Sequence, residues 1–361
     1  MIIGSISENK ILEKRISITP DLVKKYVSQG FKVLIEENYG DHIGFSNNEY
    51  QTEGSEIDSK NNVIDKSNIL LQVDIPEQGS LDQIKANKIL IGNFNYYNNE
   101  EKLKNLSKKK INIFSLELLP RITRAQSMDI LSSQANLAGY KAVVDSFANF
   151  QKAVPMMMTA AGTVPAARVL VVGAGVAGLQ AIATAKRMGA IVFATDVRMT
   201  SKEQVESLGG KFLSVKGAED LETKGGYAKE AYEKFKKKQE ELILETLKKI
   251  DIVICTALIP GKKAPIIINE KMIEIMKKGS VIYDLAAAQG GNSAYTTVDE
   301  ILEKNWVNIF GEKNILNKLA TSASSLYAKN LFNFVLNLHD KKTNKVNINL
   351  EDEIIKKTII K

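Results

Sequence analysis

The sequence predicts an α/β protein of two Rossmann-like, doubly wound domains with a cleft between them. Three observations lead to this prediction: short apolar runs alternate with helical stretches in the first third of the chain, a second alternation opens at Arg168, and a long helical stretch separates the two. Strands that alternate with helices are typical of a parallel sheet, because parallel strands need crossover connections. The 361 residues are enough for two domains with separate cores.

The first domain is expected to begin with a strand at Ile2–Gly4. The next helix has Thr19 as its predicted N-cap and Pro20 in its first turn, and Gly30 ends it. The other elements expected in this domain are the strands Lys32–Ile35, Ile69–Val73, Ile89–Gly92 and Ile111–Ser115, and a helix at Glu100–Lys109.

A long helix is expected from Ser127 to Phe150, because apolar residues recur near one face, and we interpret it as a strut between the domains. The second domain opens at Arg168. Its expected strands are Val169–Val172, Ile191–Thr195, Ile250–Thr256 and Val281–Asp284.

The last part of the chain is expected to rejoin the first domain through a packed helix at Ser322–Leu338. Beyond it, the alternation of Val346, Ile348 and Leu350 suggests an edge strand. The predicted first domain therefore comprises residues 1–132 and 318–361, and the predicted nucleotide-binding domain comprises residues 133–317.

Composition excludes several classes of protein. One cysteine, Cys255, and two histidines argue against a disulfide framework and against a zinc or other metal cluster. The net charge is +7, but lysines are mixed with acids, so we expect no nucleic-acid partner. The longest uncharged stretch, Val169–Ala185, contains three glycines and is shorter than the roughly 20 apolar residues of a membrane helix. No signal peptide is evident at the N-terminus.

A glycine-rich segment after the first strand of the second domain carries the sharpest local signal. The strand Val169–Val172 runs into Gly173-x-Gly175-x-x-Gly178 and then into a helix. In such a motif the first glycine permits the tight turn, the second lets a pyrophosphate approach the backbone, and the third lets the helix pack on the strand. The helix N-terminus offers amide groups to the phosphates.

An acidic residue stands where a dinucleotide-binding domain needs one. Asp196 follows the second strand of the unit, where its carboxylate can accept hydrogen bonds from the adenosine ribose. This favours NAD over NADP, although Arg198 two residues later weakens the preference. The other cofactor contacts expected in this unit are Ala174, Val176 and Val197.

Several segments together resemble one family. The glycine-rich unit, RITRAQSMDILSSQANLAGYKA, TALIPGKKAP and GSVIYDLAA are similar to the NAD(H)-binding component, domain I, of proton-translocating transhydrogenases, relatives of alanine dehydrogenase. The resemblance covers nearly the whole chain, beginning at Arg15–Pro20. After Gly311 this chain departs from the family, with Leu316 and Ala320 at two positions where the family has prolines.

The resemblance implies a hydride-transfer site at the start of the long helix. Carried over to this chain, the catalytic residues are Arg121, Gln126, Asp129 and Ser132, with Ser127 and Met128 as further cofactor contacts. From the residues alone, helix capping by Asp129 or a solvated turn explains the same pattern.

The resemblance also implies a mobile lid over the cofactor in segment 214–230. Tyr227 would be its aromatic residue, with Gly226 and Gln239 near the cofactor, and Leu258 would lie on the adenine side. From sequence alone the segment reads as a surface loop, and Leu258 as core packing at the end of a strand.

The resemblance further implies partners. NAD(H) would bind to this chain and NADP(H) to a partner subunit, with the proton path in membrane-spanning subunits. The chain stops at Lys361, which suggests the separate-subunit arrangement. A homodimer, and a cytoplasmic location peripheral to the inner membrane through the complex, are expected on the same ground.

Two other functions stay open at this point. An alanine dehydrogenase needs an acid/base group, but Gln72 stands where that family has a lysine, and Asn93-Phe94-Asn95 lacks its histidine. Arg15, which could clamp a substrate carboxylate or form a salt bridge, is present. A non-catalytic NAD sensor would need neither Gln126 nor Asp129. Hydride transfer between two nicotinamides needs no protein base, so a transhydrogenase fits best.

Overall fold

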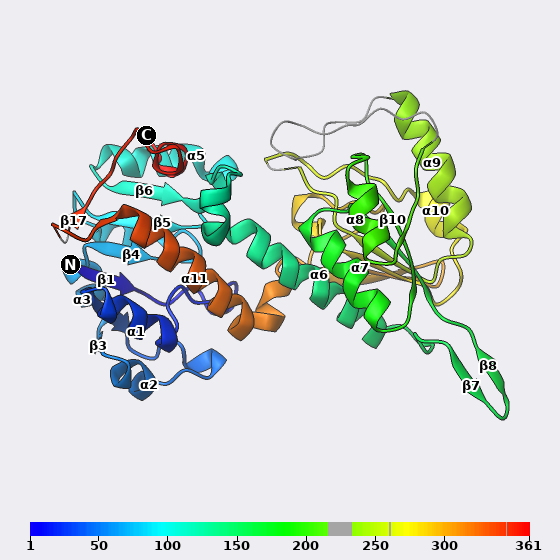
Figure 1. The fold of residues 1–361 in the computed structure, drawn as a ribbon, viewed down its shortest axis with the longest axis horizontal. Coiled ribbons are helices and arrows are strands. Elements are labelled where there is room, and N and C mark those ends of the chain that lie inside the picture. Colours follow the sequence, from blue (N-terminus) through cyan, green and yellow to red (C-terminus); the bar gives the residue numbers. More distant parts are fainter. Residues whose placement is uncertain (216–232, 260, 344) are drawn as a thin grey trace. The chain divides into compact units, whose positions relative to one another are not determined.

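The computed structural model describes residues 1–215, 233–259, 261–343 and 345–361. The chain divides into two compact units, which are treated separately below. Unit 1 comprises Met1–Gln134 and Leu316–Lys361, and unit 2 comprises Ala135–Ile315. Each unit is built on one large, mainly parallel sheet covered by helices (Figure 1).

The sheet of unit 1 has six parallel strands in the order β3-β2-β1-β4-β5-β6. The strands are β1 (Ile2–Ser5), β2 (Lys32–Glu36), β3 (Ser55–Asp58), β4 (Ile69–Leu71), β5 (Ile89–Gly92) and β6 (Asn112–Ser115). The order reverses between β1 and β4, which makes this a doubly wound sheet. The predicted fold class is confirmed for this unit.

Helices cover both faces of this sheet because successive strand residues point to opposite sides. On β2, Val33 and Ile35 pack into the core that holds Tyr327, whereas Leu34 packs into the core on the other side. The first face is covered by α1 (Pro20–Ser28) and α11 (Ala320–Leu338), and the second by α3 (Lys60–Lys66), α4 (Gln78–Gln83) and α5 (Tyr96–Lys108). Two short helices, α2 (Asn47–Thr52) and α12 (Glu353–Thr358), complete the unit.

The sheet of unit 2 has seven strands in the order β11-β10-β9-β12-β13-β15-β14. They are β9 (Arg168–Val172), β10 (Ile191–Thr195), β11 (Lys211–Phe212), β12 (Ile252–Cys255), β13 (Val281–Asp284), β14 (Glu300–Lys304) and β15 (Val307–Gly311). Only the edge strand β14 runs antiparallel among these strands. The order reverses between β9 and β12, so this sheet is also doubly wound, as predicted.

Unit 2 has helices on both faces of its sheet. The helices are α7 (Val176–Arg187), α8 (Ser201–Ser207), α9 (Glu233–Leu247), α10 (Glu270–Glu274) and most of α6 (Ile130–Ala148). Helix α6 packs closely on the start of α7, because a Cβ at Gly139 would lie only 2.0 Å from the carbonyl oxygen of Ala177.

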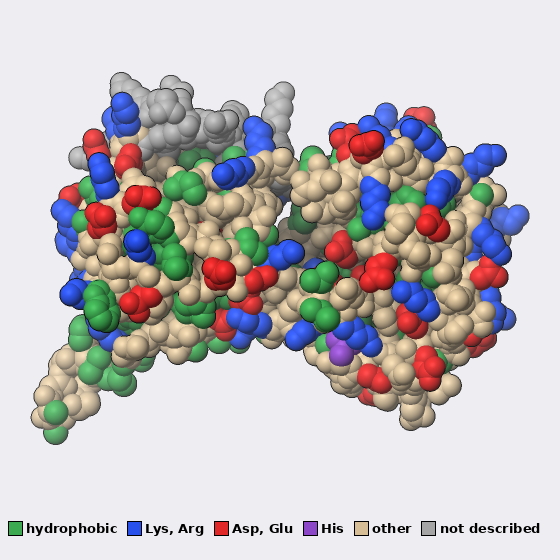
Figure 2. Space-filling model, turned by 180° about the vertical axis from the view of Figure 1, so that it is seen from behind, with side chains coloured by type: hydrophobic (Ala, Val, Ile, Leu, Met, Phe, Trp, Pro, Cys, Tyr) green, Lys and Arg blue, Asp and Glu red, His purple; other side chains and the backbone are tan. Residues whose placement is uncertain are grey.

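A two-stranded hairpin, β7 (Met157–Thr159) with β8 (Gly162–Val164), extends from unit 2 (Figure 1). Met156 and Met158 at its first strand are 62% and 81% exposed. Apolar side chains are visible along it in Figure 2. The uncharged run Ala153–Ala167 that forms this hairpin did not enter the sequence-based predictions.

Three predicted details are wrong. Thr19 occupies the N-cap position of α1, but its hydroxyl donates to Asp21 and not to the helix amides. The long helix starts at Ile130 and not at Ser127, because Thr123–Met128 forms a separate 3-10 helix. In the tail only Lys345–Val346 forms a strand, β17, against β16 (His339–Asp340), whereas Ile348 and Leu350 lie outside any strand.

Candidate dinucleotide-binding site

The glycine-rich turn of unit 2 has a backbone that only glycine adopts without strain. Gly173 follows β9 with φ +94°, and its amide still donates to the Thr195 carbonyl at 2.8 Å, which keeps the turn attached to β10. A Cβ at Gly178 would lie 1.9 Å from the carbonyl oxygen of Gly173. Gly173 thus permits the turn, and Gly178 permits α7 to pack against it.

Thr256, at the end of β12, pins this turn from the other side of the strand-order reversal. Its hydroxyl lies 2.9 Å from the carbonyl oxygen of Gly173 and 3.1 Å from that of Val172. Ligands of open α/β sheets bind outside the carboxyl ends of the strands at such a reversal. Thr256 was not among the predicted site residues, although its place in TALIPG directly after a buried strand was a usable signal.

Gly175 is the open member of the motif. The nearest heavy atom to a Cβ built there is a terminal guanidinium nitrogen of Arg198, at 3.9 Å. Val176 behind it is exposed and begins α7. The amides at the start of α7 therefore meet no side chain of the described residues close to Gly175. A phosphate group could approach the backbone here, which is what the second glycine of the motif is for.

The Asp196 carboxylate, just beyond β10, is held by four N–H donors. It accepts from the Ala174 amide at 2.7 Å and from the Arg198 amide at 2.8 Å. The Arg198 guanidinium donates to both carboxylate oxygens, at 2.9 and 2.8 Å. Asp196 is thus joined directly to the glycine-rich turn, as its predicted place beside the adenosine ribose requires, but it is also paired with Arg198. Val197 lies between them and is half-buried.

The loop after β12 is fixed by a buried asparagine. Asn292 accepts from the Ala257 amide at 2.9 Å and donates to the Ala257 carbonyl at 2.8 Å. Its own amide donates to Asp284 at 2.7 Å. The next residue in the loop, Leu258, is 42% exposed, so it is available for contact with a ligand and does not serve as core packing. Asn292 was not among the predicted residues.

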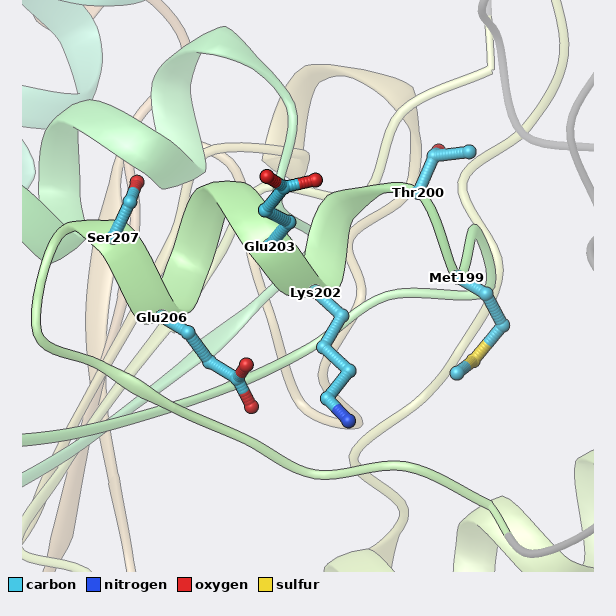
Figure 3. A pocket seen from close by; sticks show the side chains of 6 residues that line it. All are labelled: Met199, Thr200, Lys202, Glu203, Glu206 and Ser207. Carbon is cyan, nitrogen blue, oxygen red and sulfur yellow. The ribbon is translucent and has the colours of Figure 1, made fainter.

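Three residues predicted for the lid side of the site have different standing. Gln239 lies on α9 and is buried. Gly226 and Tyr227 lie outside the described residues. A hollow of about 560 Å³ lies along the neighbouring helix α8. Lys202, Glu206 and Met199 point to one side of this helix and Glu203 and Ser207 to the other, so the lining does not converge on one ligand (Figure 3).

The remaining predicted residues lie together in unit 1, on the 3-10 helix Thr123–Met128 and its flanks. Arg121, Gln126 and Ser127 are exposed, whereas Met128 is buried in the core of the unit. Helix α11 anchors this segment, because the Ser127 carbonyl accepts from Asn330 at 2.8 Å and from Asn333 at 3.0 Å. These asparagines were not anticipated, since they are about 200 residues away in sequence.

Asp129 and Ser132 cap the start of α6. The Asp129 carboxylate accepts from the Ser132 amide at 2.9 Å and from its hydroxyl at 2.6 Å. The capping reading of Asp129 is therefore correct as a description of this structure. It does not exclude contact with a ligand, because both residues are only half-buried.

The strand-order reversal of unit 1, between β1 and β4, is filled by its own side chains. The Gln72 amide group accepts from the Ile6 amide at 2.9 Å and donates to the Ile6 carbonyl at 3.1 Å. Tyr327 donates to the Gln72 carbonyl at 2.8 Å. Gln72 is buried and joins the loops after the two strands. It thus serves as a structural link at the position where an alanine dehydrogenase would need a proton-transfer group.

Arg15 is committed in the same way. Its guanidinium donates to both carboxylate oxygens of Glu13, at 2.8 and 2.7 Å, and to the Gln134 side chain at 3.0 Å. Both members of the ion pair are nearly buried. The salt-bridge reading of Arg15 is the one the structure supports, because the fork that could hold a substrate carboxylate already holds that of Glu13.

Glu8 lies beside this cluster and predicts a pH effect on stability. Burial raises the pKa of its carboxyl to about 8, against a lowering by the Val73 amide, and Glu13 and Asp74 raise it further. A carboxyl whose pKa is higher in the folded than in the unfolded chain stabilises below its unfolded value of 4.5 and loses that contribution as pH rises toward 8.

Glu8→Gln is therefore expected to be more stable than the wild type at pH 9, by on the order of 2 kcal/mol, and to match it near pH 5. Glutamine keeps an acceptor for Gln72 and Val73 but carries no charge. Urea unfolding at pH 5, 7 and 9 measures the difference. Parallel profiles for the two proteins would show that Glu8 does not titrate in this range.

Metal-binding clusters and membrane-spanning helices also bear on the function. No group of three or more metal-ligating side chains occurs among residues 1–215, 233–259, 261–343 and 345–361. Within those ranges no helix combines the length and the apolar character that crossing a bilayer requires.

Comparison with known proteins gives the following matches. The family models described as "Alanine dehydrogenase/PNT, N-terminal domain" and "Alanine dehydrogenase/PNT, C-terminal domain" match residues 4–138 and 142–361. The chain is 48% identical over 356 residues to the first of the separate NAD(P) transhydrogenase alpha-subunit chains of Rhodospirillum rubrum, covering 96% of this chain and 93% of that protein. It is 43% identical over 366 residues to the protein of the same name from Rickettsia prowazekii, covering 100% and 94%. The crystal structure of a transhydrogenase from Sinorhizobium meliloti superimposes with a TM-score of 0.90 at 41% identity, over 99% of this chain and 98% of that chain.

Proposed function

Because this chain belongs to the alanine dehydrogenase/PNT family, we propose that it is the NAD(H)-binding subunit of an NAD(P) transhydrogenase and transfers hydride between NAD(H) and NADP(H) held by a partner subunit. The observation that carries the proposal is the site at the carboxyl end of β9. There, Gly175 leaves the backbone open to a pyrophosphate and Asp196 is bonded to the same turn.

The residues fit a dinucleotide. A side chain at Gly173 or Gly178 would collide with Thr256 or with the turn itself, so the backbone is kept bare where phosphates would lie. Amides at the start of α7 would bind the pyrophosphate, and Asp196 would bind the adenosine ribose. Leu258, exposed in the loop held by Asn292, would contact the adenine.

The reacting end of the cofactor would be oriented by unit 1. Arg121, Gln126, Asp129 and Ser132 would hold the nicotinamide ribose and carboxamide, on a segment that α11 fixes through Asn330 and Asn333. When bound, NAD(H) supplies the hydride chemistry, and the protein supplies binding and orientation. Two nicotinamides must approach to about 3–3.5 Å with water excluded, and no protein base is required.

The buried contacts of unit 1 favour this proposal over an alanine dehydrogenase. Gln72 is bonded in both directions to Ile6, and the Arg15 guanidinium is paired with Glu13. Neither side chain is placed to exchange a proton with a substrate. A non-catalytic NAD sensor is less well supported, because it would not need the exposed polar side chains of Arg121 and Gln126 on a segment tied down by α11.

The proposal extends to partners. NADP(H) would be bound, and protons conducted, by other subunits, which would hold this chain at the inner surface of the membrane. A homodimer is proposed as well. The exposed methionines of the β7–β8 hairpin support it, since an isolated hairpin is marginally stable in water and gains by being covered. Sedimentation velocity would measure the mass.

The purified chain is expected to bind NADH at least about 10-fold more tightly than NADPH, because Asp196 would lose its ribose bonds and meet a 2′-phosphate. Titration of nicotinamide fluorescence measures both affinities. With a transhydrogenase NADP(H)-binding subunit added, stopped-flow absorbance should show direct hydride transfer, whereas alanine with NAD should give no turnover. Binding of NADH without transfer would favour the sensor, and robust alanine oxidation would restore the dehydrogenase.

A further inference from the structure

The donors around the Asp196 carboxylate form an anion-binding site that the protein fills with its own side chain. Four N–H groups point at this carboxylate, at 2.7 to 2.9 Å: the amides of Ala174 and Arg198 and two guanidinium nitrogens of Arg198. Two of the four are backbone groups, fixed by the glycine-rich turn and by the end of β10. They stay in place when a side chain is shortened.

We propose that this cradle is a latent site for the 2′-phosphate of NADP(H), with Arg198 as its anchor, and that Asp196 excludes NADPH by occupying it. The proposal rests on the proposed function in one respect, that a dinucleotide binds here with its adenosine ribose at Asp196. It goes beyond that function, because it assigns the choice between NADH and NADPH to a pair of residues and not to one carboxylate.

Charge alone does not explain the exclusion. The side chains of Arg198 and Asp196 are 15% and 6% exposed and form a two-point ion pair, so the pair is close to neutral as seen by an incoming phosphate. A carboxylate paired in this way repels a phosphate less than a free one does. What the pair denies to a 2′-phosphate is the donors, which are already taken.

The donor set suits a phosphate monoester. Arginine binds phosphate through two parallel N–H groups, and such charge-assisted bonds are stronger than neutral ones. An arginine beside the ribose site is also how dinucleotide-binding domains accommodate a 2′-phosphate. A terminal nitrogen of Arg198 lies 3.9 Å from the position of a Cβ on Gly175, so the guanidinium is at the adenosine side of the predicted pyrophosphate position.

Truncation of Asp196 is the direct test. In Asp196→Ala, the affinity ratio of NADPH to NADH is expected to rise by about 100-fold over the wild type, largely through a gain in NADPH affinity. In the double variant Asp196→Ala/Arg198→Ala the gain should disappear, since the anchor is gone. Fluorescence titration with NADH and NADPH gives both affinities, and thermal unfolding without ligand shows whether each variant is folded.

A second measurement separates this proposal from the proposed function. Calorimetric titration of Asp196→Ala with 2′-AMP and 5′-AMP probes the cradle without a nicotinamide, and 2′-AMP should bind at least about 10-fold more tightly. If wild type fails to bind NADH, the proposed function is wrong, but a preference of the variant for 2′-AMP would still establish the cradle.

Two outcomes would overturn the proposal: a folded Asp196→Ala with no gain for either NADPH or 2′-AMP, or a gain that persists without Arg198. Should Asp196→Ala not fold, Arg198→Ala in the otherwise unchanged chain provides the test. It exposes an unpaired carboxylate, so NADPH should weaken by about 10-fold more than NADH. Equal weakening of the two cofactors would contradict the role of the pair.

Discussion

Replacing Gln126 with asparagine is expected to slow hydride transfer by about 100-fold and to leave NADH affinity nearly unchanged. Gln126 is exposed on a segment of unit 1, whereas the proposed contacts to the pyrophosphate and adenosine ribose belong to unit 2. Loss of one methylene moves the side-chain amide by more than about an ångström, and misplacement of about 1 Å costs on the order of 100-fold in rate.

Single-turnover stopped-flow with an NADP(H)-binding partner measures the rate, and titration of NADH fluorescence measures affinity. Thr123→Ser is a suitable control, because Thr123 is exposed on the same 3-10 helix but has no proposed contact with the cofactor. A collapse of NADH affinity with a near-normal transfer rate would mean that Gln126 is a binding residue only.

Alanine at two glycines of the turn is expected to separate cofactor binding from folding. Gly175→Ala should keep the free energy of unfolding within about 1 kcal/mol, because its Cβ meets nothing nearer than 3.9 Å and its φ is −76°. It should weaken NADH binding by about 100-fold or more, since the methyl group occupies the path of the pyrophosphate to the α7 amides, and each bond to a charged group contributes about 1.5–3 kcal/mol.

Gly178→Ala is the matched variant and should lose both properties. Its Cβ would lie 1.9 Å from the Gly173 carbonyl oxygen, so α7 must shift away from the turn, which is expected to destabilise the protein by about 3 kcal/mol. Denaturant unfolding and NADH titration of the two variants give the comparison. Normal NADH binding by Gly175→Ala would mean that the pyrophosphate does not lie where the motif predicts.

The parts of the fold that sequence predicted are those with a local signal. Buried parallel strands such as Val169–Val172 and Ile252–Cys255 are continuous apolar runs, and they were found. The edge strand β3 was missed because SEID is mostly polar. The β14–β15 hairpin was missed because its turn uses Asn305 and Trp306, with φ of +51° and +62°, in place of the usual Asn-Gly.

The candidate site shows the same division. Gly173, Gly175, Gly178 and Asp196 follow from their spacing in one supersecondary unit. Thr256 and Asn330 could not be predicted, because their contacts join residues more than 80 positions apart. The pairing of Arg198 with Asp196 is local, but a sequence does not say whether two neighbouring charges meet each other or a ligand.

The return of α11 to unit 1 has a consequence for synthesis. Tyr327, Leu331 and Phe334 complete a core whose strands are all made before residue 116. On the ribosome the first strands emerge long before the helix that covers one of their faces, whereas unit 2 is continuous and is complete once Ile315 has emerged. Unit 1 therefore starts first and finishes last, and until then the half-covered face of its sheet is a surface that chaperones can bind.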